Sequence, residues 1–219
     1  MQPPIAEENM TKAYWYFDFI SPFAYLQFGR FCNLPAKLEI ECKPVVFAGL
    51  LKSAGQLGPA EIPSKRKYSY RFFKWLADQR HMPFIMPPHP FNPLPLLRLS
   101  MVAGANRANV GTIFHHIYGE GYPADDPVSV AALAQKLGVD NFQERLAAQD
   151  VKDALRQNTD EAIAAGAFGV PTFIVNDEVF WGDDSTAMLL DYLDDQNLFE
   201  TPEMRRISEM PMGVSRRRD

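Results

Sequence analysis

The sequence predicts an α/β fold in which a long helical insertion divides one domain into two parts. An aromatic strand pattern over residues 13–19 leads into a helix, and a second strand pattern follows over 38–47. From residue 48 to about 150 the pattern changes to helices separated by proline and glycine, and a helix, two short strands and a last helix come after it. The expected order is therefore β-α-β, a helical insertion, then α-β-β-α.

Residues 13–19 are rich in aromatic side chains, which favours a buried strand. Ser21 is a favoured N-cap and Pro22 suits the first position of a helix, and the apolar run that follows predicts a largely buried helix. Residues 38–47 alternate apolar and charged side chains before becoming wholly apolar. This pattern predicts the second strand.

The insertion and the second half carry their own boundary signals. Asp126 followed by Pro127 is a helix start, and Gly166 is placed to end the helix before it. Two short apolar runs, 172–176 and 178–181, flank Asn176-Asp177, which predicts a β-hairpin. The last helix is expected to begin near residues 184–185, and its apolar face consists of Met188, Leu189, Tyr192 and Leu193.

Length and charge limit the classes of function. The 219 residues, 47% of them hydrophobic, can bury one substantial core with an inserted lobe. The net charge is -5 and clustered positive charge occurs only at the C-terminus, so we expect no nucleic-acid partner. The N-terminal segment lacks a signal-peptide pattern, and no apolar stretch approaches the roughly 20 residues that cross a bilayer. We therefore expect a cytoplasmic protein that does not bind membranes.

The cysteines and histidines do not predict a metal or redox centre. Cys32 and Cys42 are ten positions apart and form no C-x-x-C pair, so both are expected to be buried packing thiols. The four histidines show no zinc-ligand spacing with another ligand, and we expect no metal.

Two motifs carry a resemblance to a known family. FDFISPFAYL at 17–26 and GAFGVPTFIVNDEVFWGDD at 166–184 together resemble the 2-hydroxychromene-2-carboxylate isomerase family, relatives of kappa-class glutathione transferases and DsbA-type oxidoreductases. The resemblance covers roughly residues 13–199. It implies a thioredoxin-like fold with a helical insertion: residues 13–50 and 151–199 would form the thioredoxin-like domain and 51–150 the inserted helical domain. The two ends lie outside the resemblance. Residues 204–219 carry basic runs without apolar periodicity, and we expect 1–12 and 204–219 to be flexible termini.

Ser21 is the central candidate for a catalytic and cofactor-binding residue. In a disulfide oxidoreductase this strand-to-helix turn carries a cysteine, whose thiolate is stabilised by the helix N-terminus. A serine there cannot exchange disulfides, but its hydroxyl can donate a hydrogen bond to a ligand's thiolate, and glutathione is the obvious ligand. The alternative is that Ser21 only caps the helix. The sequence pattern predicts no role for Asp18, which lies three positions before Ser21.

Val170-Pro171 is the second candidate element. A proline directly before a strand leaves one backbone edge unpaired, and such bonds are sometimes cis. The resemblance implies that this bond is cis and lies beside the start of the first helix. It also implies that the main chain of Val170 pairs with the cysteinyl unit of glutathione, as an added strand would. The alternative is a proline that simply begins a strand.

Asp183 and Asp184 open the last helix, where acidic side chains cap it and complement its dipole. The same helix start can bind a carboxylate, and Asp184 can bind an ammonium group, and the γ-glutamyl end of glutathione carries both. Ser185 stands where the resembling family usually has arginine.

Four further residues are predicted at lower specificity. Lys65, in PSKRKY, resembles the family lysine that reaches the glycyl carboxylate of glutathione, although a surface charge explains it equally well. His89 and Asn92, in HPFNPL, resemble the region near the organic substrate, although a proline-rich loop explains them too. Trp181 either walls the pocket or fills the core.

The resemblance implies a glutathione-dependent isomerase that converts 2-hydroxychromene-2-carboxylate, or a related intermediate of aromatic degradation, to trans-o-hydroxybenzylidenepyruvate. Thiolate addition would open the ring, rotation about the resulting single bond would follow, and elimination would regenerate glutathione. A kappa-like glutathione transferase and a non-catalytic thioredoxin-like binding module are the alternatives. Relatives are commonly dimers, so a homodimer is expected.

Overall fold

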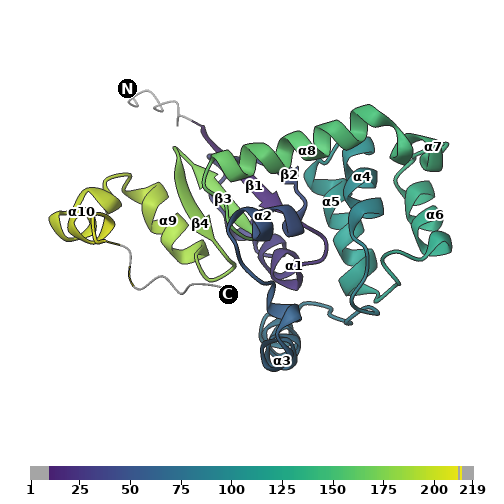
Figure 1. Ribbon diagram of the computed structural model, residues 1–219, viewed down its shortest axis with the longest axis horizontal. Coiled ribbons are helices and arrows are strands. Elements are labelled where there is room, and N and C mark those ends of the chain that lie inside the picture. The colour runs from purple at the N-terminus through teal and green to yellow at the C-terminus, as the bar shows by residue number, and fades with distance from the viewer. Residues whose placement is uncertain (1–9, 212, 214–219) are drawn as a thin grey trace, which may run out of the picture.

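The computed structural model describes residues 10–211 and 213, and a four-stranded mixed sheet lies at its centre (Figure 1). The strands are ordered β2-β1-β3-β4 across the sheet. β1 runs parallel to β2 and antiparallel to β3, and β3 runs antiparallel to β4. Their bounds are Thr11–Phe17 for β1, Leu38–Pro44 for β2, Thr172–Val175 for β3 and Glu178–Trp181 for β4.

Helices form most of the rest of the described chain. In Figure 1, α4 to α7 group on one side of the sheet, α9 and α10 lie on the other, and α8 extends from the sheet to the insertion. The helices are α1 (Pro22–Phe28), α2 (Phe47–Ser53), α3 (Pro63–Gln79), α4 (Leu94–Val102), α5 (Arg107–Phe114), α6 (Pro127–Lys136), α7 (Phe142–Ala147), α8 (Gln149–Ala164), α9 (Thr186–Asp194) and α10 (Pro202–Ser208). Short helical turns are η1 (Phe31–Asn33), η2 (Pro59–Glu61), η3 (His115–Gly119) and η4 (Leu198–Glu200).

The predicted element order is confirmed, and local chemistry explains several boundaries. Asp126 caps α6 by accepting hydrogen bonds from the N–H groups of Val128 and Ser129. Asn176 and Asp177 both have positive φ angles, 49° and 66°, which the tight turn of the β3-β4 hairpin requires. The sequence therefore predicts these turns from the conformational preferences of single residues.

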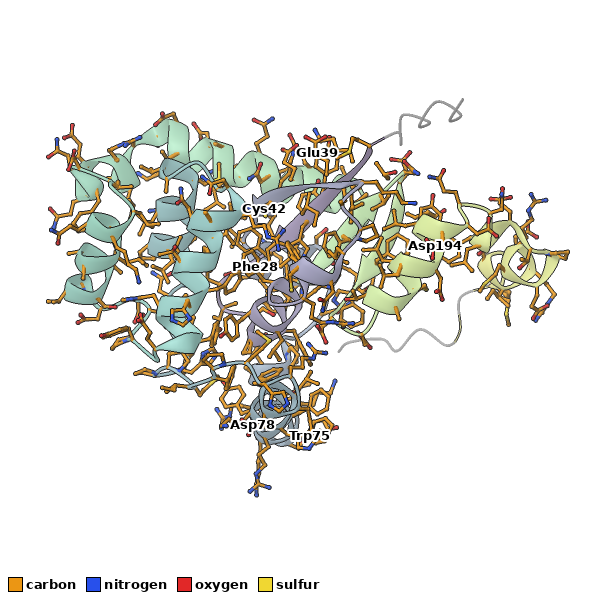
Figure 2. The ribbon with its side chains drawn as sticks, turned by 180° about the vertical axis from the view of Figure 1, so that it is seen from behind. Phe28, Glu39, Cys42, Trp75, Asp78 and Asp194 are labelled. Atoms are coloured by element: carbon orange, nitrogen blue, oxygen red, sulfur yellow. The ribbon has the colours of Figure 1, made fainter. Side chains whose placement is uncertain are left out.

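One aromatic core joins the sheet to the insertion. Trp15 of β1 stacks on Phe17 with ring centroids 4.6 Å apart, and Phe114 of α5 lies 5.7 Å from Phe17 and 4.8 Å from Phe19. Phe28 of α1 contacts both Trp15 and Phe114, and it lies near the middle of the molecule in Figure 2. The insertion therefore packs directly on the central strand, which fixes its position relative to the end of that strand.

The structure corrects three predictions about individual segments. Cys42 is buried on β2, where burial raises the pKa of its thiol to about 12, but Cys32 is exposed at η1. Helix α10 begins at Pro202 with Thr201 as its N-cap, so residues 204–208 are helical rather than an irregular tail. Thr11 and Lys12 pair with β2 as the start of β1, so the predicted flexible N-terminus is too long. The predicted flexible residues 1–9, 212 and 214–219 lie outside the described residues. No helix of the described chain is both long and apolar enough to cross a membrane.

Candidate functional site

The two sequence motifs meet at one edge of the sheet. β1 and β3 are antiparallel, and Tyr16 near the end of β1 pairs with Thr172 at the start of β3. Ser21 follows the end of β1 by four residues, and Val170-Pro171 directly precedes β3. Because the end of one antiparallel strand lies beside the start of its neighbour, the pairing brings Ser21 and Val170-Pro171 to the same edge.

Ser21 is the N-cap of α1. Its Oγ accepts a hydrogen bond from the N–H of Ala24 at 3.3 Å, and its backbone is extended, as an N-cap requires. The side chain is 9% exposed, and its hydroxyl donates no hydrogen bond to the described part of the chain. The capping role predicted for Ser21 is therefore confirmed, and the hydroxyl hydrogen stays available for an acceptor from outside the protein.

Asp18 holds the turn that leads to Ser21, a role that the sequence analysis missed. The side chain is 1% exposed, and its two oxygens accept hydrogen bonds from the N–H groups of Ile20 at 3.0 Å and Phe47 at 2.9 Å. Burial raises the pKa of this carboxyl to about 7. An acidic residue between two phenylalanines was the available signal, because a buried carboxyl must find hydrogen-bond donors.

We expect Asp18 to make stability depend on pH. Its folded-state pKa of about 7 lies above the ordinary value of 3.8, so between these values the folded protein keeps a proton that the unfolded chain has lost. The free energy of unfolding should therefore fall as the pH rises from about 4 to 7, by on the order of 4 kcal/mol, and level off above that. Urea unfolding across this range measures the slope.

The matched variants are Asp18→Asn and Asp126→Asn. Each carboxylate accepts two backbone N–H bonds, but Asp126 is exposed. Asp18→Asn should flatten the slope because the amide does not titrate, while losing about 1 kcal/mol or more at every pH because its NH₂ group faces a backbone donor. Asp126→Asn should keep the wild-type slope. Parallel curves for Asp18→Asn and wild type would contradict the assignment.

Val170-Pro171 has the cis peptide bond that the resemblance implied. The N–H and C=O of Val170 form no hydrogen bond with other described residues, whereas the carbonyl of Pro171 accepts from the N–H of Gly182 at 2.8 Å. Thr172 fixes the same segment by donating from its hydroxyl to the carbonyl of Gly169 at 2.8 Å. Val170 therefore presents one unpaired peptide edge beside a firmly held strand.

Asp183 and Asp184 have different environments. Asp183 is 4% exposed and forms a bidentate pair with Arg80, the C-cap residue of α3, with N–O distances of 2.8 and 2.6 Å. Its carboxylate is therefore held by the guanidinium, and a contact between Asp183 and a cofactor stays a prediction. Asp184 is exposed and forms no ion pair within the described residues, so its carboxylate is free to take an ammonium group.

Comparison with known proteins identifies the family. The model of the DSBA-like thioredoxin domain matches residues 14–194, which include all but the first three residues of the sheet, both motifs and the insertion. The chain belongs to the DSBA-like thioredoxin family. The family resemblance and the thioredoxin-like fold expected from the sequence are thereby confirmed.

Within the DSBA-like thioredoxin family, the chain is similar to two kinds of enzyme. Glutathione s-transferase kappa 2 of Caenorhabditis elegans is 30% identical over 210 residues, covering 84% of this chain and 92% of the relative. The 2-hydroxychromene-2-carboxylate isomerase of Pseudomonas putida is 30% identical over 185 residues, covering 80% and 90%. A solved 2-hydroxychromene-2-carboxylate isomerase structure superposes with a TM-score of 0.76 at 26% identity, covering 88% and 98%. Each of these three matches covers 80% or more of this chain.

The DSBA-like thioredoxin fold also includes disulfide oxidoreductases. A probable DsbA oxidoreductase of Streptomyces coelicolor superposes with a TM-score of 0.63 at 15% identity, a likeness of fold alone. In this chain neither cysteine occupies the turn after β1: Cys32 is exposed at η1 and Cys42 is buried on β2. The turn itself carries Ser21, which cannot form a disulfide.

Trp181 walls this edge of the sheet. It ends β4, is 50% exposed, packs on Phe168 with ring centroids 5.0 Å apart, and its indole lies against Gly169, where a Cβ would collide with it. The alternative that Trp181 fills the core is therefore wrong. Its indole therefore lies against the residue that precedes Val170, and half of its surface is exposed.

The remaining predicted residues lie on other elements. Lys65 is exposed in the first turn of α3 and makes no ion pair in the described chain. His89 lies between the rings of Tyr70 and Phe91, and burial lowers the pKa of its imidazole, which favours the neutral form. Asn92 accepts a hydrogen bond from the N–H of Leu94 at 3.1 Å and so helps to begin α4. No hydrogen bond or ion pair among the described residues joins these three to Ser21 or Val170.

Proposed function

We propose that the protein is a glutathione-dependent isomerase acting on 2-hydroxychromene-2-carboxylate or a related aromatic-degradation intermediate. The observation that carries the proposal is the meeting, at one sheet edge, of a serine hydroxyl with an uncommitted hydrogen and an unpaired peptide edge at Val170. Similarity to the isomerases over 80% or more of the chain supports the reaction class.

The residues at this edge fit glutathione in three respects. The N–H and C=O of Val170 can pair with the cysteinyl peptide unit, because both lack partners among the described residues. The Ser21 hydroxyl can donate to the thiolate, and the exposed Asp184 carboxylate can bind the ammonium group. The three groups match three different parts of the tripeptide, so the proposed site would bind the whole of glutathione and not its thiol alone.

Bound glutathione would supply a thiolate that adds to the conjugated system of the substrate and leaves again after ring opening and bond rotation. The protein's share of this chemistry is to hold and stabilise that sulfur. Ser21 would donate a hydrogen bond to it, Asp18 would keep the preceding turn fixed through two backbone bonds, and Trp181 would cover one side of the ligand.

A kappa-like glutathione transferase is the second candidate, since the C. elegans transferase is as similar to the chain as the P. putida isomerase. The two reactions would share the thiolate site and differ in the product. An isomerase returns free glutathione, whereas a transferase leaves the tripeptide covalently attached to the organic product.

Two measurements on the full chain test the proposal. Isothermal titration should show glutathione binding at or below millimolar concentration, and S-methylglutathione serves as a control that lacks the titratable thiol. Turnover of 2-hydroxychromene-2-carboxylate is then followed by absorbance, with mass spectrometry of the products. Unchanged glutathione with isomerised product supports the isomerase, a thioether product supports the transferase, and no glutathione binding at millimolar concentration would leave only a binding module.

A further inference from the structure

A charged cleft lies between α2, α4 and α8, apart from the residues assigned to the glutathione site. Its cavity volume is about 730 Å³, which is within the range of small-molecule sites. α8 contacts both α2 and α4, and Figure 1 shows α8 above the other two helices. None of the residues predicted for the glutathione site lines this cleft.

Positive charge dominates the lining. Lys52 comes from α2, Arg98 from α4, and Lys152 and Arg156 from α8, whereas Asp160 is the sole acidic lining residue among those the structure describes. None of these four cations makes an ion pair within the described part of the chain. In a protein of net charge -5, four unpaired cations around one cleft create a local positive potential that attracts anions.

Arg98 is a cation of the cleft whose guanidinium has no partner among the described residues. Its side chain is half-buried at the cleft, and its Nε is buried without a hydrogen-bond partner among the described residues. The terminal nitrogens of Arg98 also make no hydrogen bond or ion pair within the described residues and, unlike Nε, are not buried, so the end of the guanidinium can reach a ligand in the cleft. A guanidinium matches the oxygens of a carboxylate or phosphate with two parallel hydrogen bonds.

The cleft also has an apolar part. Val46, Leu94, Leu155 and Ile163 contribute to the lining beside the cations. Val46 is anchored, since its N–H donates to the hydroxyl of Thr159 on α8 at 3.0 Å, and the next N–H, that of Phe47, donates to Asp18. Hydrogen bonds therefore hold this part of the lining, and the lining as a whole favours a ligand with an apolar body and an anionic end.

We propose that this cleft binds a small oxyanion, a carboxylate or a phosphate, carried on an apolar body. Arg98 binds the oxyanion at the inner end, Lys152 and Arg156 add attraction from α8, and the apolar side chains contact the body of the ligand. The site is independent of glutathione and of Ser21, so it stands whether or not the proposed isomerisation is correct.

Titration of the full chain with three probes tests the site. trans-Cinnamate and phenyl phosphate carry the two oxyanions on an aromatic body, and cinnamamide is the uncharged counterpart of cinnamate. We expect at least one anionic probe to bind about tenfold or more tighter than cinnamamide, with an affinity that falls as salt rises. The anionic probe that binds more tightly shows whether the cleft prefers a carboxylate or a phosphate. Amide NMR shifts at Gly49, which lines the cleft, locate the binding.

Variants then change the charge in both directions. Arg98→Met should weaken binding of the anionic probe about tenfold without weakening binding of cinnamamide. The variant keeps the aliphatic part of the side chain and loses the guanidinium donors. Asp160→Asn, an exposed position, should tighten the anion about threefold. Arg71→Met removes an exposed arginine of α3 outside the cleft and should change nothing.

The outcomes that would overturn the proposal are specific. Equal affinities for cinnamate, phenyl phosphate and cinnamamide would exclude an oxyanion site. Anion binding that is insensitive to both Arg98→Met and Asp160→Asn, or that shifts amides away from Gly49, would place binding elsewhere. Because Asp160→Asn should strengthen binding, a loss of folding in Arg98→Met does not remove the test.

Discussion

Ser21→Ala should lower the turnover of chromene carboxylate by roughly 100- to 1000-fold, the effect of removing one hydrogen-bond donor from a reacting anion. The Ser21 hydroxyl hydrogen has no acceptor within the described residues, so the variant removes a donor reserved for the ligand. The pKa of bound glutathione, followed by thiolate absorbance, should rise. Lower turnover together with a higher thiol pKa of bound glutathione indicates loss of the hydrogen-bond donor, because a misfolded variant would not bind glutathione.

Thr201→Ala is the matched control for the capping role. Thr201 caps α10 by accepting from the N–H of Met204 at 3.3 Å, the same distance at which Ser21 accepts from Ala24. Both alanine variants should lose about 1 kcal/mol or less of stability through the cap, but only Ser21→Ala should lose turnover. Full activity in Ser21→Ala would show that Ser21 is a cap and nothing more.

Arg80→Met should destabilise the protein by about 3–5 kcal/mol, the cost of leaving a buried charge without its partner. Asp183 is 4% exposed and depends on Arg80 for two short bonds, whereas the more distant Arg30 guanidinium lies 3.9 Å away. The pair ties α3 to the turn before α9, and Arg80 also donates to the carbonyl of Leu26 in α1. Urea unfolding measures the loss.

A double-mutant cycle tests the pairing of Arg80 with Asp183, and an exposed ion pair serves as the control. Arg80→Met with Asp183→Asn should be less destabilised than the sum of the single variants, because no charge is then left unpaired. Lys74→Met breaks the exposed Lys74–Asp78 pair on the same helix and should cost about 0.5 kcal/mol or less. If Arg80→Met were as mild as Lys74→Met, Asp183 would not depend on this pair.

Most of the fold could be predicted because its signals are local. The aromatic run of β1, Ser21-Pro22 at the start of α1, Asp126-Pro127 at α6 and Asn176-Asp177 in the hairpin each reflect backbone preferences of a few neighbouring residues. The prediction for Cys32 was wrong because exposure depends on which way a short helical turn faces, which the aromatic run around it does not determine.

The candidate site was predicted in part for the same reason. Ser21 and Val170-Pro171 were identified from motifs, and antiparallel pairing of β1 with β3 brings them to one edge. Asp183 and Asp184 are neighbours in the sequence and look alike there, yet one is buried against Arg80 and the other is exposed. Arg80 is 103 positions away from Asp183, so no local pattern could assign the pair.

By itself the sequence determined the order of elements, the serine at the strand-to-helix turn and the absence of a cysteine there. Only the tertiary structure decided that Asp18 is a buried carboxyl with a raised pKa that fixes a turn, and that Asp183 pairs with Arg80. The basic cleft between three helices also became evident only there. The physical reason is that backbone preferences act between neighbours, whereas burial and charge pairing depend on contacts between distant segments.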